Sequence, residues 1–145
     1  ASFNTEEHHE FSLPFDSEAT VVKLSDGKYV GRRGLAKNMS CDMGPSALLD
    51  LGGIQVVVIT HRCQCLDPMQ LELFGVDIAQ ARVVVVKSRG HFRSGFDEFF
   101  KPDQIYEVDC PGLTSPVLAN FNWTGLPRPV YPLDEDTTWT PPTTV

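Results

Sequence analysis

The sequence predicts an α/β fold with a three-layer-like, parallel βαβαβ core, preceded by antiparallel β-hairpins, so that the whole sheet is mixed. Residues 54–60 and 82–87 are near-continuous Val and Ile runs, which is typical of strands covered by helices on both faces. A third β-rich run follows at residues 104–108. Helical patterns separate the three runs, and short right-handed crossovers would then make the strands parallel neighbours.

The hairpins are predicted ahead of this core. Residues 19–24 are β-rich, the step Asp26-Gly27 favours a turn, and Tyr29-Val30 resumes a strand, which together indicate one hairpin. A basic loop is expected from Gly31 to Gly34.

A second β pair is predicted around the dipeptide Gly52-Gly53, which suits a primed turn between the apolar runs 47–51 and 54–60. The segment from Asp42 to Ser46 is interpreted as a turn between strand segments, with Asp42 as its cap.

Two helices are predicted between the core strands. Asp67-Pro68 provides an N-cap followed by Pro at the first helical position, and the first helix is expected to stop at Gly75. The second helix should bury one face and end before Pro102. Its apolar residues fall at positions i, i+4, i+7 and i+8, namely Phe92, Phe96, Phe99 and Phe100.

The termini differ from the centre in composition. Residues 1–18 carry five acids without a base and are expected to form an acidic, flexible arm, while residues 135–145 form a tail rich in Thr and Pro. Residues 19–134 are expected to form a single α/β domain.

Composition excludes several classes of function. The net charge is −7, but eight acids lie in residues 1–18 and from Asp134 onward, and the remaining 11 acids stand against 12 bases. No stripe of Lys and Arg with aromatic residues supports nucleic-acid binding. The apolar runs are far shorter than the roughly 20 residues of a membrane span. Four scattered cysteines do not make a disulfide scaffold and indicate a reducing cytoplasm.

The candidate binding site is cationic. Ligands collect beyond the carboxyl ends of parallel strands, where this sequence would place a set of polar and basic side chains. A helix start prefers acids, yet none occurs between the second strand and Asp97, which favours an anion or substrate site. The alternative is that the bases are solvated or paired with Asp67, Asp77 or Asp109. The candidate residues are Arg62, Lys87, Ser88, His91 and Arg93.

The sequence gives little support for a metal site or for nucleophilic catalysis within this chain. Cys63-x-Cys65 lacks a second pair of ligands, and the run His8-His9-Glu10 lacks a scaffold, so no metal ligand is assigned. Ser46 lacks a nucleophile elbow and Cys110 lacks a helix start behind it, so no catalytic residue is assigned either.

Several segments together resemble the C-terminal domain of the MlrC (microcystinase C) family of predicted zinc metallopeptidases. Their order and spacing hold from about residue 15 to residue 134. The segments are Leu24 to Tyr29, Asp42 to Leu49, Gly52 to Ile54, Val85 to Ser88 with His91-Phe92-Arg93, and Arg128 to Asp134.

The resemblance implies the C-terminal domain of a longer enzyme, a hydrolase that cleaves peptide or amide bonds with zinc-activated water. Its zinc would be bound by an N-terminal domain, so this chain would hold no cofactor and, in isolation, would be inactive. The implied partners are that N-terminal metal-binding domain and a peptide or amide substrate, without nucleic acid or membrane, and with a homo-oligomer as a further expectation. Lys87, His91 and Arg93 would then line the mouth of a substrate cleft.

A different class of function stays open. The chain would then be a noncatalytic anion-binding or assembly domain whose basic loop is structural. A regulatory α/β domain of the flavodoxin-like kind is disfavoured, because no paired acids follow the predicted strands.

Overall fold

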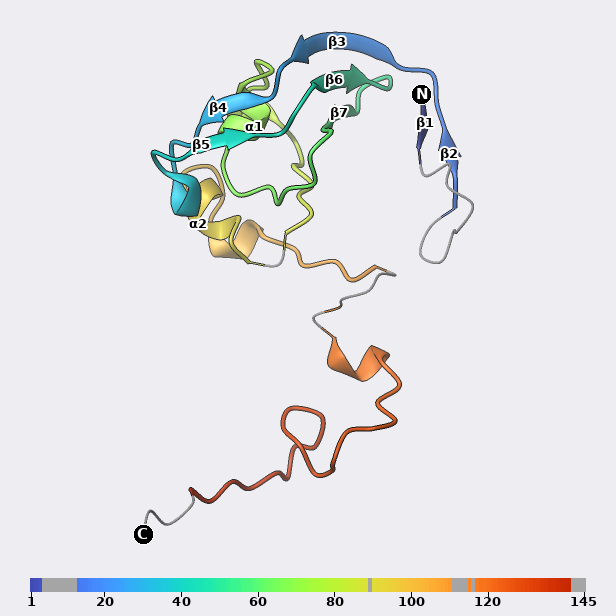
Figure 1. Cartoon of the computed structure of the whole chain (residues 1–145), viewed down its shortest axis with the longest axis vertical. Coiled ribbons are helices and arrows are strands. Elements are labelled where there is room, and N and C mark those ends of the chain that lie inside the picture. Colours follow the sequence, from blue (N-terminus) through green and yellow to red (C-terminus); the bar gives the residue numbers. More distant parts are fainter. Residues whose placement is uncertain (4–12, 89, 111–114, 116, 142–145) are drawn as a thin grey trace. The chain divides into compact units, whose positions relative to one another are not determined.

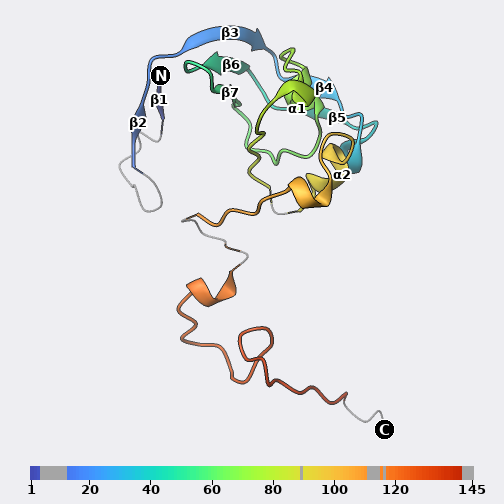
Figure 2. The same ribbon diagram turned by 180° about the vertical axis from the view of Figure 1, so that it is seen from behind.

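A computed structural model describes residues 1–3, 13–88, 90–110, 115 and 117–141. The chain divides into two compact units, residues 1–106 and 107–145, and each is considered by itself. Figures 1 and 2 show the chain from opposite sides.

The main sheet of the first unit has three antiparallel strands in the order β3-β6-β7. These are β3 (Thr20–Ser25), β6 (Ser46–Asp50) and β7 (Gln55–Val58). The predicted hairpin at Gly52-Gly53 is confirmed, because it joins β6 to β7. Both glycines have positive φ, at 83° and 100°, and their N–H groups donate to Asp50 Oδ1 at 2.9 and 3.0 Å.

The predicted hairpin between residues 19–24 and 29–30 is wrong in its pairing, although both strands exist. β3 pairs with β6, whereas β4 (Lys28–Val30) pairs with β5 (Ser40–Asp42) in a separate antiparallel sheet. The chain turns at Gly27 (φ 78°), whose Cα lies against the backbone of Gly44, so β4 leaves the plane of β3. A short pair, β1 (Ser2–Phe3) with β2 (Phe15–Asp16), precedes them.

The predicted turn between strand segments is present from Asp42 to Ser46, between β5 and β6. Gly44 N–H donates to Asp42 Oδ1 at 2.7 Å, so Asp42 caps the turn as expected.

The predicted parallel βαβαβ core is wrong. β7 is antiparallel to β6, and the described residues of 82–88 and 104–108 contain no strand. The helices explain the failure, because α1 (Met69–Glu72) and α2 (Arg93–Phe96) have four residues each and extend only about 6 Å. A crossover between parallel strands needs a dozen or more residues to return the chain along the sheet.

The sequence signals for helix ends agree with the structure better than the signals for strand pairing do. Met69 N–H donates to Asp67 Oδ1 at 2.8 Å, so Asp67 starts α1, and the following turn stops at Gly75 (φ 82°). The second predicted helix is shorter than expected and continues as turns to Phe99. The remaining helical turns are η1 (Gly34–Ala36), η2 (Ile78–Gln80), η3 (Pro102–Gln104) and η4 (Leu118–Asn120).

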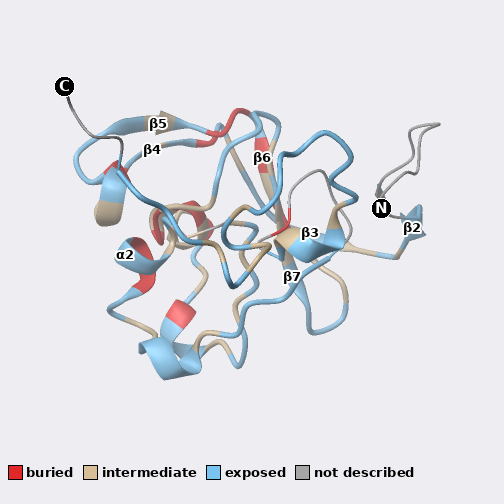
Figure 3. Ribbon diagram, turned by 90° about the horizontal axis from the view of Figure 1, so that it is seen from below, coloured by how far each residue is buried: buried red, intermediate tan, exposed pale blue. Residues whose placement is uncertain are grey.

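The core of the first unit is small. Met43, Leu48 and Phe74 pack together with 1, 2 and 4% exposure, and the half-buried Tyr29 and Val57 pack against them. β3, in contrast, is largely exposed, as Figure 3 shows. α2 lies beside η1 (Figure 1), and a Cβ on its Gly95 would come within 2.1 Å of Leu66 O, so glycine permits this approach.

The second unit is held by polar contacts of its own. Asp109 accepts from Ser115 Oγ at 2.7 Å, and Trp123 Nε1 donates to Leu118 O at 2.7 Å. Asp134 pairs with the Arg128 guanidinium, which, with a bond from the Val130 N–H, lowers the pKa of Asp134 to about 2. The Arg128-Pro129 and Tyr131-Pro132 peptide bonds are cis. Across the described ranges, every helix is too short or too polar to cross a membrane.

The close approach at Gly27 can be tested with a matched pair of glycines. Gly27→Ala would bring a Cβ within 2.0 Å of Gly44 O, whereas Gly52→Ala meets nothing within 4 Å at a similar φ of 83°. Gly52→Ala should cost about 1–2 kcal/mol for the left-handed backbone alone. Gly27→Ala should cost about 2 kcal/mol more, measured by urea unfolding. Equal costs would contradict the close approach.

Candidate functional site

Asp67 anchors the loops around the candidate site. Its side chain is fully buried, at 0% exposure. Oδ2 accepts the backbone N–H groups of Arg32 and Arg33, both at 2.7 Å, while Oδ1 accepts that of Met69 at 2.8 Å. The carboxylate therefore fastens the loop before η1 to the start of α1, and this arrangement is called the Asp67 clamp below.

The guanidinium of Arg32, next to the Asp67 clamp in the chain, binds two glutamates. It binds Glu72 in a bidentate manner, through Nε at 2.7 Å and Nη2 at 2.6 Å, and it also donates to Glu98. The Phe99 ring lies 5.8 Å from its central carbon. The hydrogen bonds to Glu72 and then Glu98 raise the pKa of Arg32, and the bond from Arg32 lowers the pKa of Glu98.

Arg33 makes a second link to the turn that follows α2. Its guanidinium pairs with Asp97 and lies 3.3 Å from Glu98 Oε2, and the Asp97 contact is the main cause that raises the pKa of Arg33. The basic loop seen in the sequence is therefore neutralised inside the unit. These partners were not predicted from the sequence, because 40 or more residues separate Arg32 from Glu72 and Glu98. The one sequence signal that could have indicated them is the group of acids at the two helices.

Gln70 fixes the loop that carries Arg62. The buried Gln70 side chain accepts the Leu66 N–H at 2.7 Å and donates to Gln64 O at 3.0 Å. It also lies 3.6 Å from Cys63 Sγ and 3.8 Å from Met43 Sδ. The loop at residues 61–66 is thus tied both to α1 and to the core.

The structure brings two of the predicted site loops together. His91 Nδ1 lies 3.2 Å from Gln64 Oε1, so the loop of His91 meets the loop that carries Arg62 (Figure 2 shows the region of α2 from behind). Ser94 Oγ donates to His91 O at 3.2 Å and steadies the turn into α2. The side chains of His91 and Arg62 are both exposed.

The other predicted site residues take different positions. Lys87 is exposed, and the hydroxyl of Ser88 is shielded from solvent yet has no hydrogen-bond partner among the described residues. Arg93 belongs to α2, and its guanidinium lies 5.3 Å from the Phe92 ring. Arg89, within the same loop, lies outside the described residues.

The carboxylates weighed as alternative partners are engaged elsewhere. Asp67 binds backbone N–H groups, Asp77 accepts from Ala79 N–H at 3.0 Å, and Asp109 binds Ser115 and Asn120. Within the described ranges, neither Lys87 nor Arg62 forms an ion pair. Structural pairing with these three acids therefore does not account for the two cations.

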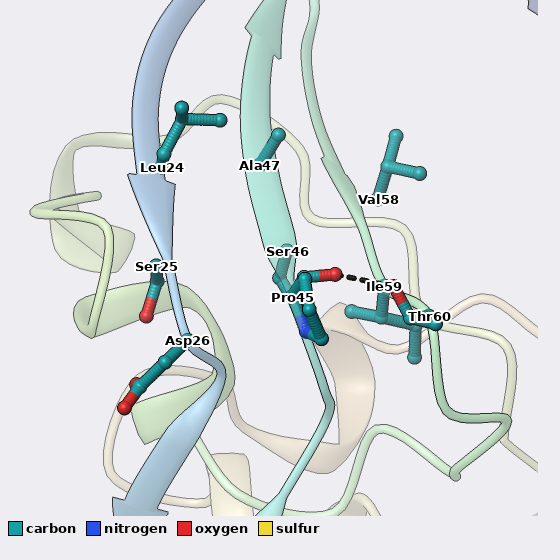
Figure 4. Close-up of a pocket in the computed structure, with 9 residues that line it drawn as sticks. All are labelled: Leu24, Ser25, Asp26, Pro45, Ser46, Ala47, Val58, Ile59 and Thr60. Atoms are coloured by element: carbon teal, nitrogen blue, oxygen red, sulfur yellow. Dashed lines mark hydrogen bonds between the residues drawn. The ribbon is translucent and has the colours of Figure 1, made fainter.

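An open groove of about 570 Å³ lies at one end of the main sheet (Figure 4). Its polar groups bond within the fold, since Ser46 Oγ donates to Gly44 O at 2.6 Å and Thr60 Oγ1 donates to Pro45 O. It is lined by Leu24, Ser25, Asp26, Pro45, Ser46, Ala47, Val58, Ile59 and Thr60. The groove gathers no acid, base or nucleophile set that would support catalysis.

The thiols near the core do not suit zinc. Burial raises the pKa of Cys63, and it raises that of Cys65 to about 11, so releasing either proton to bind zinc costs more than for an exposed thiol. No three His, Cys, Asp or Glu side chains converge in the described part of the chain. The residues present there do not fit a zinc site, and His8-His9-Glu10 lies outside the described residues.

Comparison with known proteins gives one match. Residues 4–125, more than half of the chain, match the family model described as MlrC C-terminus. The segment from Arg128 to Asp134, which also carries the resemblance, lies beyond the matched residues. Neither the curated proteins nor the solved structures contain a match to the chain.

The Asp67 clamp can be tested by removing the carboxylate. Asp67→Ala leaves three N–H groups without their acceptor, each worth about 1–3 kcal/mol when buried, so the free energy of unfolding should fall by at least about 3 kcal/mol. The control Asp77→Ala removes one bond at an exposed cap and should cost about 1 kcal/mol. Urea unfolding measures both, and similar losses would refute the clamp.

Proposed function

The chain belongs to the MlrC C-terminal domain family, and we propose that it contributes the substrate cleft or scaffold of a zinc metallopeptidase or amide hydrolase. The metal would be held outside this chain. The substrate would be a peptide or amide, and the main partner would be the N-terminal metal-binding domain of the same protein. A cytoplasmic location and a homo-oligomer remain predictions.

The observation that carries the proposal is the meeting of two cationic loops. The contact between His91 and Gln64, at 3.2 Å, joins the loop of Lys87 to that of Arg62. Arg32 and Arg33 form ion pairs with acids of the same unit. Arg62 and Lys87, in contrast, are exposed and pair with no acid in the described part of the chain. Exposed cations on two loops that touch favour an external anion, such as the carboxylate of a peptide.

The chemistry assigned to this chain is binding and orientation. Guanidinium and ammonium groups can hold a substrate carboxylate, or stabilise an oxyanion that forms during amide cleavage. Zinc, when bound by the intact protein, would supply the activated water. Because the described residues do not fit a zinc site, no metal ligand and no general base are assigned to this chain.

An assembly role is the second candidate, and a separate observation favours it. Large apolar side chains are exposed along β3, namely Val21 at 57%, Val22 at 51% and Leu24 at 73%. Such surface is typical of contacts with another polypeptide segment.

The anion role can be tested in the intact protein. Lys87→Ala and Arg62→Ala should each lower kcat/KM for short peptides with a free C-terminal carboxylate by about 10- to 150-fold, since a hydrogen bond to a charged group contributes about 1.5–3 kcal/mol. The same peptides with an amidated C-terminus should be affected much less. Product formation is followed by chromatography.

Lys28→Ala is the matched control, because Lys28 is an exposed lysine of β4 with no ion pair in the described ranges. Lys28→Ala should leave kcat/KM unchanged for both the free and the amidated peptides. If the loop variants behave like this control on both kinds of peptide while their Tm is unchanged, the anion role is wrong.

A further inference from the structure

The open groove at the end of the main sheet is crossed by a row of apolar side chains. Leu24, Ala47 and Val58 are cross-strand neighbours on β3, β6 and β7 (Figure 4). The alternation along β6 places Ala47 on the face opposite to the buried Leu48, which belongs to the core. Leu24 is 73% and Val58 37% exposed, while Ala47 between them is half-buried. The groove therefore has a small apolar residue at its centre and larger ones at its sides.

Opposite charges lie at the two sides of this groove. Asp26, on the β3 side, is exposed, accepts the Lys28 N–H at 3.1 Å and forms no ion pair in the described ranges. Thr60, on the β7 side, comes two residues before the exposed Arg62. Figure 4 shows Asp26 and Thr60 on opposite sides of Pro45. A ligand with an ammonium group at one end and a carboxylate at the other complements this arrangement.

His61 fixes the chain between the groove and Arg62. Its N–H donates to Met43 O at 2.8 Å, and its ring packs on Gly44, where a Cβ would come within 3.0 Å of the imidazole. His61 Nδ1 lies 3.7 Å from Asp42 Oδ1. Because the Asp42 carboxylate already faces this imidazole, a ligand carboxylate is directed to Arg62 rather than to His61.

The spacing of the strands restricts the length of the ligand. Neighbouring strands lie about 4.8 Å apart, so the Asp26 side and the Thr60 side are separated by about 10 Å. An extended peptide covers about 3.3–3.6 Å per residue, so a tripeptide crosses the groove. Its central side chain would then lie above Ala47.

We infer that this groove is a binding subsite for short zwitterionic peptides with an apolar central side chain. The ammonium group of the peptide binds Asp26, and its carboxylate binds Arg62. The inference rests on the proposed function for the role of Arg62, and it extends that function by naming the class of peptide. Burial of the central side chain against Leu24, Ala47 and Val58 supplies affinity, and the two end charges set the orientation.

Calorimetric titration of the intact protein tests the subsite. The probes are the tripeptides Gly-Leu-Gly and Gly-Ser-Gly with N-methylated peptide bonds, which resist hydrolysis. The leucine peptide should bind about tenfold more tightly than the serine peptide, because its side chain loses apolar surface to water only when it is free. Acetylation of the N-terminus should weaken binding by about threefold, since an exposed ion pair is weak.

Substitutions in the groove separate its parts. Ala47→Phe fills the groove and should reduce the tenfold preference for leucine to about one, while Leu24→Ser should reduce it to about threefold. The control Val22→Ser, at an exposed valine of β3 that does not line the groove, should retain it. Asp26→Asn keeps an acceptor for the Lys28 N–H and should remove only the effect of acetylation. The Tm of each variant shows that it is folded.

Several results would overturn the inference. These are equal binding of the two peptides, no binding of either, or a preference for leucine that Ala47→Phe and Leu24→Ser leave at tenfold. An effect of acetylation that survives in Asp26→Asn contradicts the role of that acid. Affinity that falls as the protein concentration rises would assign the groove to a second copy of the chain, which also contradicts the inference.

Amidation of the C-terminus of the same peptides reports the anion role separately. If only the anion role fails, amidation has no effect and the preference for leucine persists. If only the groove fails, the preference is lost while amidation still weakens binding. Neither result depends on catalysis.

Discussion

The buried carboxylate of Asp67 is the constraint on which the first unit depends. A core of so few buried side chains cannot by itself fix long irregular loops, and here one acid accepts three backbone N–H groups from two segments 35 residues apart. Arg32 and Arg33 are thereby held where they reach Glu72, Asp97 and Glu98, which ties α2 to α1. Gln70, one turn after Asp67, extends the same support to the loop of Arg62.

This framework separates the cations into two groups with different surroundings. The Arg32 and Arg33 guanidinium groups are partly buried and bound to acids, and their loss would act through the fold. The exposed Arg62 and Lys87 have no such partners in the described residues, and the fold gains little from them. Their loops nonetheless meet at Gln64 and His91, and the anion role proposed for Arg62 and Lys87 rests on this contact.

Local features of the fold were predictable from the sequence, whereas pairing was not. The turn at Gly52-Gly53 and the start of α1 at Asp67-Pro68 depend on a few neighbouring residues, so the local sequence was enough to place them. The Val run at residues 82–87 has the propensity of a strand, but propensity does not determine a partner, and a parallel core was wrongly inferred from it. Two of the three backbone N–H donors to Asp67, those of Arg32 and Arg33, lie more than 30 residues away and leave no trace in the pattern of side chains. The site residues were found by a broken helix-start rule, and their use is still a prediction.

We propose that this domain brings cations, but no metal ligand, to the catalytic cleft of an MlrC-type hydrolase. A crystal structure of the intact protein, with anomalous diffraction at the zinc edge, tests it most directly. We expect a zinc peak whose ligands all lie outside these 145 residues, in a cavity that Arg62 and Lys87 face. Zinc bound by His61, Cys63 or His91, or an Arg62 and Lys87 pair turned away from the metal cavity, would contradict it.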